Sequence, residues 1–364
     1  MDIDVTFLTK LKIHCMSNGI RLDAGVFSRL TLGGEVPLTI HEHPTTGGIT
    51  LRMGEVYLNA PFDEWYCERS QALLAEASDG ALEVRYDGKS VPCDVLPLPN
   101  YLSELNSLGH RVIDTTISHC DRIRISPISG CVLDCAFCDI PSRRYQRHEA
   151  DEILASLEVA KQDRNIPAHH MLICGGSPGP NHLAWFDEMI CTVTANSGLV
   201  TDVMMSAREG DLGFIRRYAD AGVSGFSFNL EVFGDESAAY IMPRKHVRSS
   251  PHLARTIEAA LEVVGGKGRV RSIIVIGLED AEATLRGIDF LASLGCEPVL
   301  SPFRPSRNTA LVAHEPPTEE YLTHIYDRAL EIVATHGVRL GPRCIPCQNN
   351  TLVLPDGSPD YWYS

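Results

Sequence analysis

The sequence predicts an α/β protein built on a partial, TIM-like (β/α)6 barrel, with an N-terminal α+β domain and a short C-terminal extension. Two observations carry this prediction. Strand-like and helix-like segments alternate six times between residues 116 and 340, and such alternation produces a parallel sheet with right-handed crossovers. The unusual polar and glycine-rich residues follow the strands instead of preceding them, which is where a parallel barrel builds its site.

Residues 1–115 have a different pattern and are interpreted as a small cap domain whose chemistry the residues do not indicate. Turn signals and alternating apolar residues predict hairpins over 49–60 and 82–93, with an extended linker at 95–99. His41, His43 and Cys93 have no ligand spacing and are read as structural. The other expected elements are a helix over 6–18, strands over 28–32 and 36–41, and a helix over 63–76.

Residues 116–340 are expected to form the barrel. Its strands are nearly all apolar, as expected when both faces of a parallel sheet are covered. The expected strands are 122–128, 170–174, 202–206, 225–230, 270–276 and 298–303. The expected helices are 151–162, 183–195, 211–220, 251–264, 281–294 and 318–335.

Charge and hydropathy exclude several classes of function. The 364 residues carry a formal net charge of −15, which argues against a general nucleic-acid binder and against binding to anionic membranes. The acidic start has no apolar signal region, and no apolar run approaches the length of a membrane span. We therefore expect a cytoplasmic protein that binds neither nucleic acid nor membranes.

Three of the twelve cysteines lie close together after the first barrel strand. Cys131, Cys135 and Cys138 have the spacing C-x3-C-x2-C, so their thiolates can reach one metal centre. A lone tetrahedral zinc would need a fourth protein ligand. An iron–sulfur cluster also binds through thiolates, and its fourth iron can be left open. Iron–sulfur and zinc readings both remain possible from the spacing alone.

The same triplet, with Phe137 before its last cysteine, resembles the signature of the radical S-adenosylmethionine (SAM) superfamily. The resemblance implies that Cys131, Cys135 and Cys138 hold a 4Fe–4S cluster whose open iron is chelated by the amino and carboxylate groups of SAM. It also implies a barrel fold and reductive cleavage of SAM to a 5′-deoxyadenosyl radical.

Further segments resemble the SAM-binding positions of that family. Residues 175–178 resemble its Gly-Gly-Glu-Pro segment, with Ser177 in place of the glutamate, and polar residues follow the third and fourth strands. Asn229 and Glu231 are candidates for the ribose hydroxyls, because residues two apart on a strand point to the same side. The residues expected to contact SAM are Phe137, Gly175, Gly176, Ser177, Pro178, Ser206, Arg208, Asn229, Glu231, Arg244, Val275 and Ile276.

The closest resemblance within the superfamily is to the small-molecule branch that includes biotin synthase, lipoyl synthase and a hydrogenase-maturation protein. Asn229-Leu-Glu231 and the segment from Pro302 to Thr309 carry it. Arg304 and Arg307 lie in the second of these segments, and we expect them either to hold an anionic substrate or to belong to a solvated loop.

The C-terminal segment 341–364 contains Cys344 and Cys347, spaced C-x2-C. Two thiolates do not complete a metal site, so a second metal or cluster would need further ligands such as Cys296, Cys120 or a histidine. Alternatively, one of the pair is a catalytic thiol in the substrate cavity, acting as a hydrogen donor or covalent anchor. Two buried thiols are the third possibility, and the sequence does not decide among them.

The function implied by the resemblance is that of a radical SAM enzyme that abstracts hydrogen from a small polar metabolite in a biosynthetic rearrangement or bond-forming reaction. A flavodoxin or a ferredoxin-type protein would supply the electron. Transfer of a methyl group or of another SAM fragment is an alternative, and a non-catalytic zinc-binding barrel is another. The sequence does not indicate substrate identity or oligomeric state.

Overall fold

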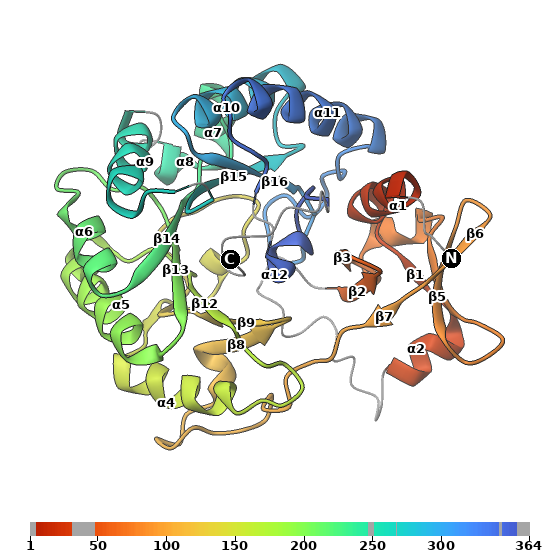
Figure 1. Ribbon diagram of the computed structural model, residues 1–364, viewed down its shortest axis with the longest axis horizontal. Coiled ribbons are helices and arrows are strands. Elements are labelled where there is room, and N and C mark those ends of the chain that lie inside the picture. The colour runs from red at the N-terminus through yellow and green to blue at the C-terminus, as the bar shows by residue number, and fades with distance from the viewer. Residues whose placement is uncertain (1–4, 31–47, 247–250, 267, 342–343, 355–364) are drawn as a thin grey trace.

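A seven-stranded sheet curls around the centre of the molecule (Figure 1). The structure is a computed structural model that describes residues 5–30, 48–246, 251–266, 268–341 and 344–354. Six of the strands are parallel, in the order β16-β15-β14-β13-β12-β9, which confirms the predicted partial barrel. These strands are β9 (Arg122–Ile125), β12 (His170–Ile173), β13 (Val200–Met205), β14 (Val223–Phe228), β15 (Val270–Ile276) and β16 (Glu297–Pro302).

The seventh strand, β8 (Thr116–His119), was not predicted. It pairs antiparallel with β9 and forms one edge of the sheet. The expected first strand over 122–128 is also shorter than predicted, because β9 ends at Ile125. A separate short strand, β10 (Ile128–Ser129), then pairs with β11 (Gln146–Arg147) and closes off the cysteine loop between them.

Helices cover the outer side of the sheet (Figure 1). All six predicted helices form, with ends within two residues of the expected ones. Asp280 and Thr318 begin two of them by accepting hydrogen bonds from backbone N–H groups in the first turn. The helices are α4 (Ala150–Lys161), α5 (Leu183–Ser197), α6 (Gly213–Asp220), α7 (Asp235–Ile241), α8 (Pro243–His246), α9 (Pro251–Val264), α10 (Ala281–Ser293) and α11 (Glu319–Thr335). Short 3-10 turns lie at Val112–Asp114, Ile140–Ser142 and Pro180–His182.

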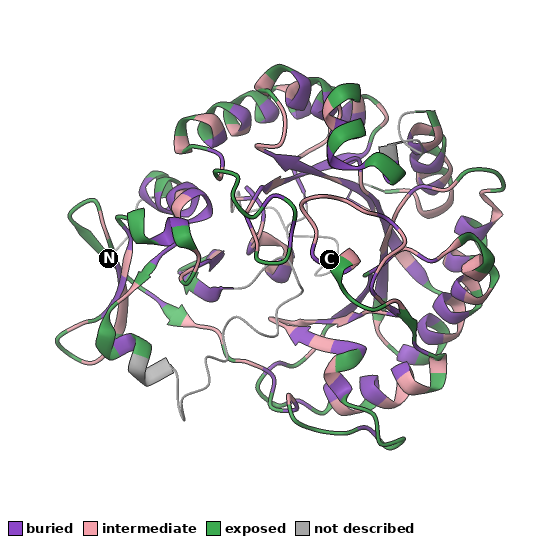
Figure 2. Ribbon diagram, turned by 180° about the vertical axis from the view of Figure 1, so that it is seen from behind, coloured by how far each residue is buried: buried purple, intermediate pink, exposed green. Residues whose placement is uncertain are grey.

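Strand β9 differs on its two faces, and it is apolar on the face that the helices cover. Ile123 and Ile125 are fully buried there. Much of the curled sheet is buried (Figure 2). The concave face instead carries Arg122 and Arg124, which alternate with them along β9. The expectation of nearly all-apolar strands therefore fails on β9, whose concave face borders a cavity and not a packed core. Other strands present apolar side chains to the same cavity, among them Leu172, Ile273 and Val299.

The N-terminal region contains two small sheets with the orders β1-β4-β5-β6 and β3-β2-β7. The two predicted hairpins are confirmed. The elements are α1 (Val5–Asn18), β1 (Arg21–Leu22), α2 (Ala24–Leu30), β2 (Ile49–Met53), β3 (Val56–Ala60), the 3-10 turn Trp65–Arg69, β4 (Leu73–Glu76), β5 (Leu82–Tyr86), β6 (Lys89–Pro92) and β7 (Asp94–Val95).

Two predictions for this region were wrong. The expected helix over 63–76 is a 3-10 turn followed by β4, because Leu73 and Leu74 pair with strands on both sides, β1 and β5. The expected strand over 28–32 begins inside the helix α2. The expected strand over 36–41 and the two histidines at its end lie outside the described residues.

Residues 344–353, here called the closing segment, lie between the two edges of the open barrel (Figure 1). The backbone N–H of Leu352 donates to Leu300 of β16, at 2.8 Å, and the Asn349 amide contacts His119 of β8. The segment includes α12 (Ile345–Gln348). From the N-terminal region, Lys12 donates to two of its carbonyls. Because these parts interlock, the division of the chain at 115 and 341 stays a prediction.

Within the described residues, no helix combines the length and the apolar character needed to cross a bilayer.

Candidate active site

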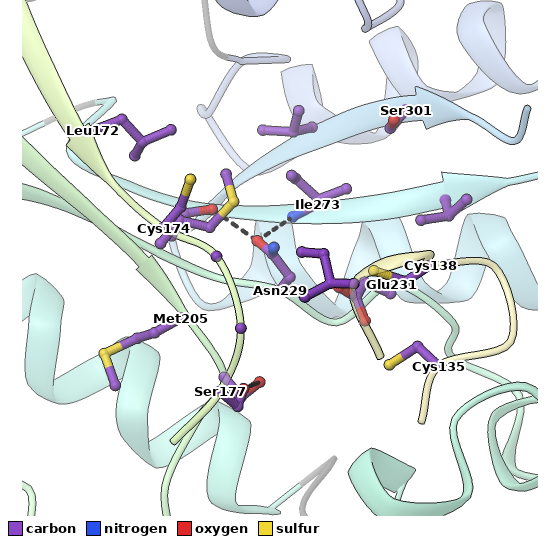
Figure 3. Close-up of a pocket in the computed structure, with 18 of the residues that line it drawn as sticks. Cys135, Cys138, Leu172, Cys174, Ser177, Met205, Asn229, Glu231, Ile273 and Ser301 are labelled. Atoms are coloured by element: carbon purple, nitrogen blue, oxygen red, sulfur yellow. Dashed lines mark hydrogen bonds between the residues drawn. The ribbon is translucent and has the colours of Figure 1, made fainter. Parts of the chain in front are cut away.

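A cavity of about 350 Å³ occupies the concave side of the curled sheet. Every parallel strand contributes to its wall, and so do the loops that follow β9 and β12 and the closing segment. Figure 3 shows part of it, where Cys135 and Cys138 of the cysteine loop lie near Asn229 and Glu231, which follow β14. The sequence placed the site at the carboxyl ends of the strands, but the cavity continues to their beginnings.

Cys131, Cys135 and Cys138 all line this cavity. The backbone N–H groups of Leu133 and Ser177 lie 3.3 and 3.2 Å from the sulfur of Cys131 and donate to it. Donors of this kind stabilise a thiolate more than a thiol.

Burial raises the pKa of Cys135 and raises that of Cys138 to about 12, so both are thiols until a metal displaces the proton. Within the described residues no three His, Cys, Asp or Glu side chains already converge on one metal-ion position. The donor set is nevertheless three soft sulfur ligands beside backbone N–H groups, which fits an iron–sulfur cluster.

The glycine-rich loop after β12 packs directly on the cysteine loop. A side chain at Gly176 would place its first carbon 1.7 Å from the carbonyl oxygen of Gly130, so only glycine fits there. Val132 donates its N–H to the carbonyl of Ser177, at 3.4 Å. The hydroxyl groups of Ser177 and Ser206 lie 3.3 Å apart. The two predicted loops therefore form one continuous rim.

Asn229 and Glu231 both line the cavity. They lie beyond the end of β14, and Glu231 has a φ of 67°, so the strand spacing used in the prediction is not what places them there. The Asn229 carbonyl oxygen accepts hydrogen bonds from Ser227 and from the backbone of Ile273, which fixes the amide. Glu231 forms a buried ion pair with Lys245, at 2.6 Å. Lys245 was missed by the sequence reading, which chose its neighbour Arg244.

The comparisons with known proteins agree with this geometry. Residues 125–291 match the family model described as the radical SAM superfamily. Residues 125–291 therefore form a radical SAM domain. A radical SAM domain implies a 4Fe–4S cluster and SAM as cofactors.

Solved radical SAM structures resemble the chain at low identity. They include the FeFe-hydrogenase maturase HydG from Carboxydothermus hydrogenoformans, with 14% identity, TM-score 0.44 and coverage of 58% of this chain and 51% of HydG. A radical SAM methyltransferase from Sphaerobacter thermophilus has 17% identity, TM-score 0.47 and coverage of 74% and 76%. Methylornithine synthase has 16% identity, TM-score 0.48 and coverage of 66% and 73%.

The matched part of the chain spans about half the length of HydG. No curated protein sequence matches the chain.

Other predicted SAM contacts divide between the cavity and its surroundings. The cavity is lined by Gly175, Pro178, Phe137 and Val275. Ile276 instead faces the helix side of the sheet and is fully buried there.

The two arginines predicted to contact SAM differ in their surroundings. Arg208 lines the cavity but is engaged by Asp187, at 2.6 Å, and by the ring of Phe214. Arg244 lies outside, with two-thirds of its side chain exposed, and donates to Val132 of the cysteine loop. Its position supports the loop from the surface.

The two arginines predicted to bind substrate also differ. Arg304 lines the cavity and donates to the backbone and side-chain oxygens of Asn59 in β3, at 2.6 and 2.9 Å. Arg307 is exposed and contacts Asp63 at the surface. Cys344 and Cys347 both line the cavity, and a guanidinium N–H of Arg122 donates to the sulfur of Cys347.

Sequence reasoning missed the charged residues at the inner end of the cavity, which is the end where the strands begin. Arg271 and Asp202 form an ion pair of 3.0 Å across β15 and β13. His170 is neutral, because burial first and the charges of Arg122 and Arg271 next lower its pKa to about 2. The alternation Arg-Ile-Arg-Ile at the start of β9 was the available signal, since it places two cations on one face of a strand.

Proposed function

We propose that the protein reductively cleaves SAM at a 4Fe–4S cluster held by Cys131, Cys135 and Cys138, and that the resulting 5′-deoxyadenosyl radical abstracts hydrogen from a small polar metabolite. One observation supports this most strongly: the triplet, the glycine-rich loop and the Asn229–Glu231 pair line one cavity. The cofactors supply the radical chemistry, and the protein supplies position and exclusion of water.

In this proposal the rim residues orient SAM. The backbone groups at Gly175 and Gly176 face the cavity and can approach a ligand closely, because no side chain intervenes. Asn229 has its oxygen fixed by two donors, which leaves its amide nitrogen to donate to a ribose hydroxyl. Glu231 and Lys245 place one acceptor and one cation next to each other, suited to a hydroxyl and to a carboxylate of the same ligand.

The surface beside the cysteine loop supports an acidic electron donor of the flavodoxin or ferredoxin type. Arg143 and Arg244 flank the loop, each paired with one aspartate, Asp139 or Asp134, and each still has half or more of its side chain exposed to a partner. Opposite charges at such a contact speed association and make its rate sensitive to salt. We therefore expect reduction of the cluster by the donor protein to slow as ionic strength rises.

The test uses the anaerobically reconstituted full chain. Cys135→Ala should lose bound iron and sulfide and form no 5′-deoxyadenosine from SAM in the presence of a chemical reductant. Cys191→Ala is the matched control, because Cys191 lies on α5 outside the cavity, where its thiol contacts Arg217. Normal 5′-deoxyadenosine formation by Cys135→Ala would contradict the proposal that the triplet holds the cluster.

A second candidate function is transfer of a methyl group or another SAM fragment. It is favoured by the presence of two thiols, Cys344 and Cys347, in the wall of the same cavity. Methyl-labelled SAM distinguishes the two functions. If transfer through a thiol occurs, the label appears on Cys344 or Cys347 in the intact-protein mass. If hydrogen abstraction occurs, 5′-deoxyadenosine forms and neither cysteine gains mass. A second metal or cluster at this pair would instead appear as iron beyond that bound by the triplet.

A further inference from the structure

The inner end of the cavity, where the strands begin, lies away from the proposed SAM site at their carboxyl ends. Strand β9 begins at Arg122, and the loop that leads to Cys131 starts four residues later. At ~3.3 Å per strand residue, Arg122 lies roughly 13 Å along the strand from the start of that loop. This distance leaves room for a small molecule between the two. The residues at the inner end are therefore placed to bind the far end of a substrate.

The cations of the cavity differ in what balances them. Lys245, Arg208 and Arg271 each have a carboxylate partner within 3.0 Å. Arg122 has no carboxylate partner among the described residues, and its hydrogen bond goes to the sulfur of Cys347, at 2.7 Å. Its Nε–H is buried and has no acceptor in the described part of the chain.

A guanidinium that is largely removed from water and paired with no anion is costly, since the hydrogen bond to the Cys347 sulfur replaces only part of its lost hydration. The surroundings reinforce the positive potential. Arg124 lines the cavity from the same face of β9, and His170, next to Arg122 across the sheet, is neutral. What remains accessible on Arg122 opens onto the cavity, so an anion can reach it from inside.

We propose that the guanidinium of Arg122 binds the carboxylate of the substrate at the inner end of the cavity, beside Cys347. The inference rests on the proposed function and narrows its substrate to a small carboxylic acid. A carboxylate is the matching group because a guanidinium offers paired donors in a plane and one positive charge. The carboxylate neutralises Arg122, and the rest of the molecule extends toward the SAM site.

The position of Cys347 beside Arg122 allows a direct test with iodoacetate, which is a small carboxylic acid that alkylates thiols. Iodoacetamide is its neutral control. The reconstituted protein is treated with each reagent, and alkylation of Cys347 and Cys191 is measured by peptide mass spectrometry. Cys191 is the reference thiol because it lies away from the cavity, and Cys344 and Cys174 are more deeply buried than Cys347.

For each cysteine, the alkylation rate with iodoacetate is divided by the rate with iodoacetamide. This ratio should be at least ~10-fold higher at Cys347 than at Cys191, which is the factor that corresponds to one charge-assisted contact. Arg122→Gln should lower the ratio to that of Cys191, and Arg122→Lys should restore part of it. Iron content verifies that each variant is folded. Propionate should protect Cys347 more than inorganic phosphate does.

Several results would overturn the proposal. Equal ratios at the two cysteines, or an excess that survives Arg122→Gln, would mean that Arg122 attracts no carboxylate. A ratio below that of Cys191 would mean that Cys347 is a thiolate that already neutralises Arg122. Absence of alkylation by both reagents would mean that the inner end admits no acid, and protection by phosphate alone would assign the site to another anion. Iron binding and SAM cleavage, measured separately, report on the proposed function.

Discussion

The two ends of the cavity are built in different ways. The outer end consists of loops that follow β9, β12 and β14, and backbone N–H groups reach the sulfur of Cys131 there. The inner end consists of side chains that alternate along the strands and of the closing segment. Arg122 and Cys347, which touch at the inner end, are 225 positions apart in the chain.

This difference indicates a division of labour. The outer end depends on a few consecutive residues that we propose bind the 4Fe–4S cluster and SAM. The inner end depends on contacts between distant parts of this chain, including Lys12 from the N-terminal region. Changes at the outer end should therefore stop SAM cleavage itself, whereas changes at the inner end should alter the stability of the closing segment or the choice of substrate.

The largest effect is expected for the ion pair between Lys245 and Glu231. Lys245→Met leaves the buried Glu231 carboxylate without its partner, which costs about 3–5 kcal/mol of unfolding free energy. Denaturant titration measures this cost. Adding Glu231→Gln to the variant should recover most of it, and Arg286→Met, which breaks an exposed pair with Glu282, should cost less than about 1 kcal/mol. Equal costs for Lys245→Met and Arg286→Met would contradict the burial of the first pair.

The next largest effect is expected for Gly176→Ala. The added methyl would meet the Gly130 carbonyl oxygen at 1.7 Å, so the glycine-rich loop and the cysteine loop must separate. A displacement of this size can cost ~100-fold in rate. 5′-Deoxyadenosine formation measures it. Gly179→Ala is the control, because its methyl would meet no atom closer than 3.7 Å. If both variants cleave SAM at the normal rate, the packing of the two loops is unimportant.

The outer end could be predicted from the sequence because its parts are local. The C-x3-C-x2-C spacing and the Gly-Gly-Ser-Pro run each lie within one loop, and the repeated β-α units predict that these loops share one edge of the sheet. Where the prediction depended on the direction of one side chain it was less exact. The sequence favoured Arg244, but the turn of α8 puts Lys245 in the cavity and Arg244 on the surface.

The inner end could not be predicted in the same way. The alternation of Arg122 and Arg124 with isoleucine was visible, yet it was interpreted as part of an apolar strand. Nothing local indicates that Cys347 returns to contact Arg122, since the closing segment is held by single hydrogen bonds to distant strands and to α1. The expected helix over 63–76 failed for the same reason, because pairing on both sides of β4 overrode the local pattern.

A pH-dependent effect is expected from Lys12. Burial first, and the charge of Arg304 next, lower its pKa to about 7, from an ordinary value of 10.5. Between these values the folded state binds fewer protons than the unfolded state, so stability rises with pH by up to about 1.4 kcal/mol per unit. Below pH 7 both states are protonated and this contribution stays constant. The neutral amine still has two N–H donors for the carbonyls of Gln348 and Val353.

The comparison with Lys12→Met isolates this effect. From pH 7 to 8.5 the wild-type protein should gain about 1.6 kcal/mol of unfolding free energy relative to the variant, as measured by urea titration at each pH. Other groups that titrate in this range contribute equally to both proteins. Parallel stability curves for the two proteins would show that Lys12 keeps its ordinary pKa and does not control the closing segment.

The smallest effects compare the two arginines of the loop after β16. Arg304→Gln removes two charged hydrogen bonds to Asn59 that join β3 to the barrel, so we expect a loss of about 1.5 kcal/mol in unfolding free energy. Arg307→Gln removes only an exposed contact with Asp63 and should change stability by less than about 0.5 kcal/mol. If Arg304 instead binds substrate, its loss will leave stability unchanged and weaken substrate binding, and the cavity will then have two arginines that recognise the substrate, one at each end.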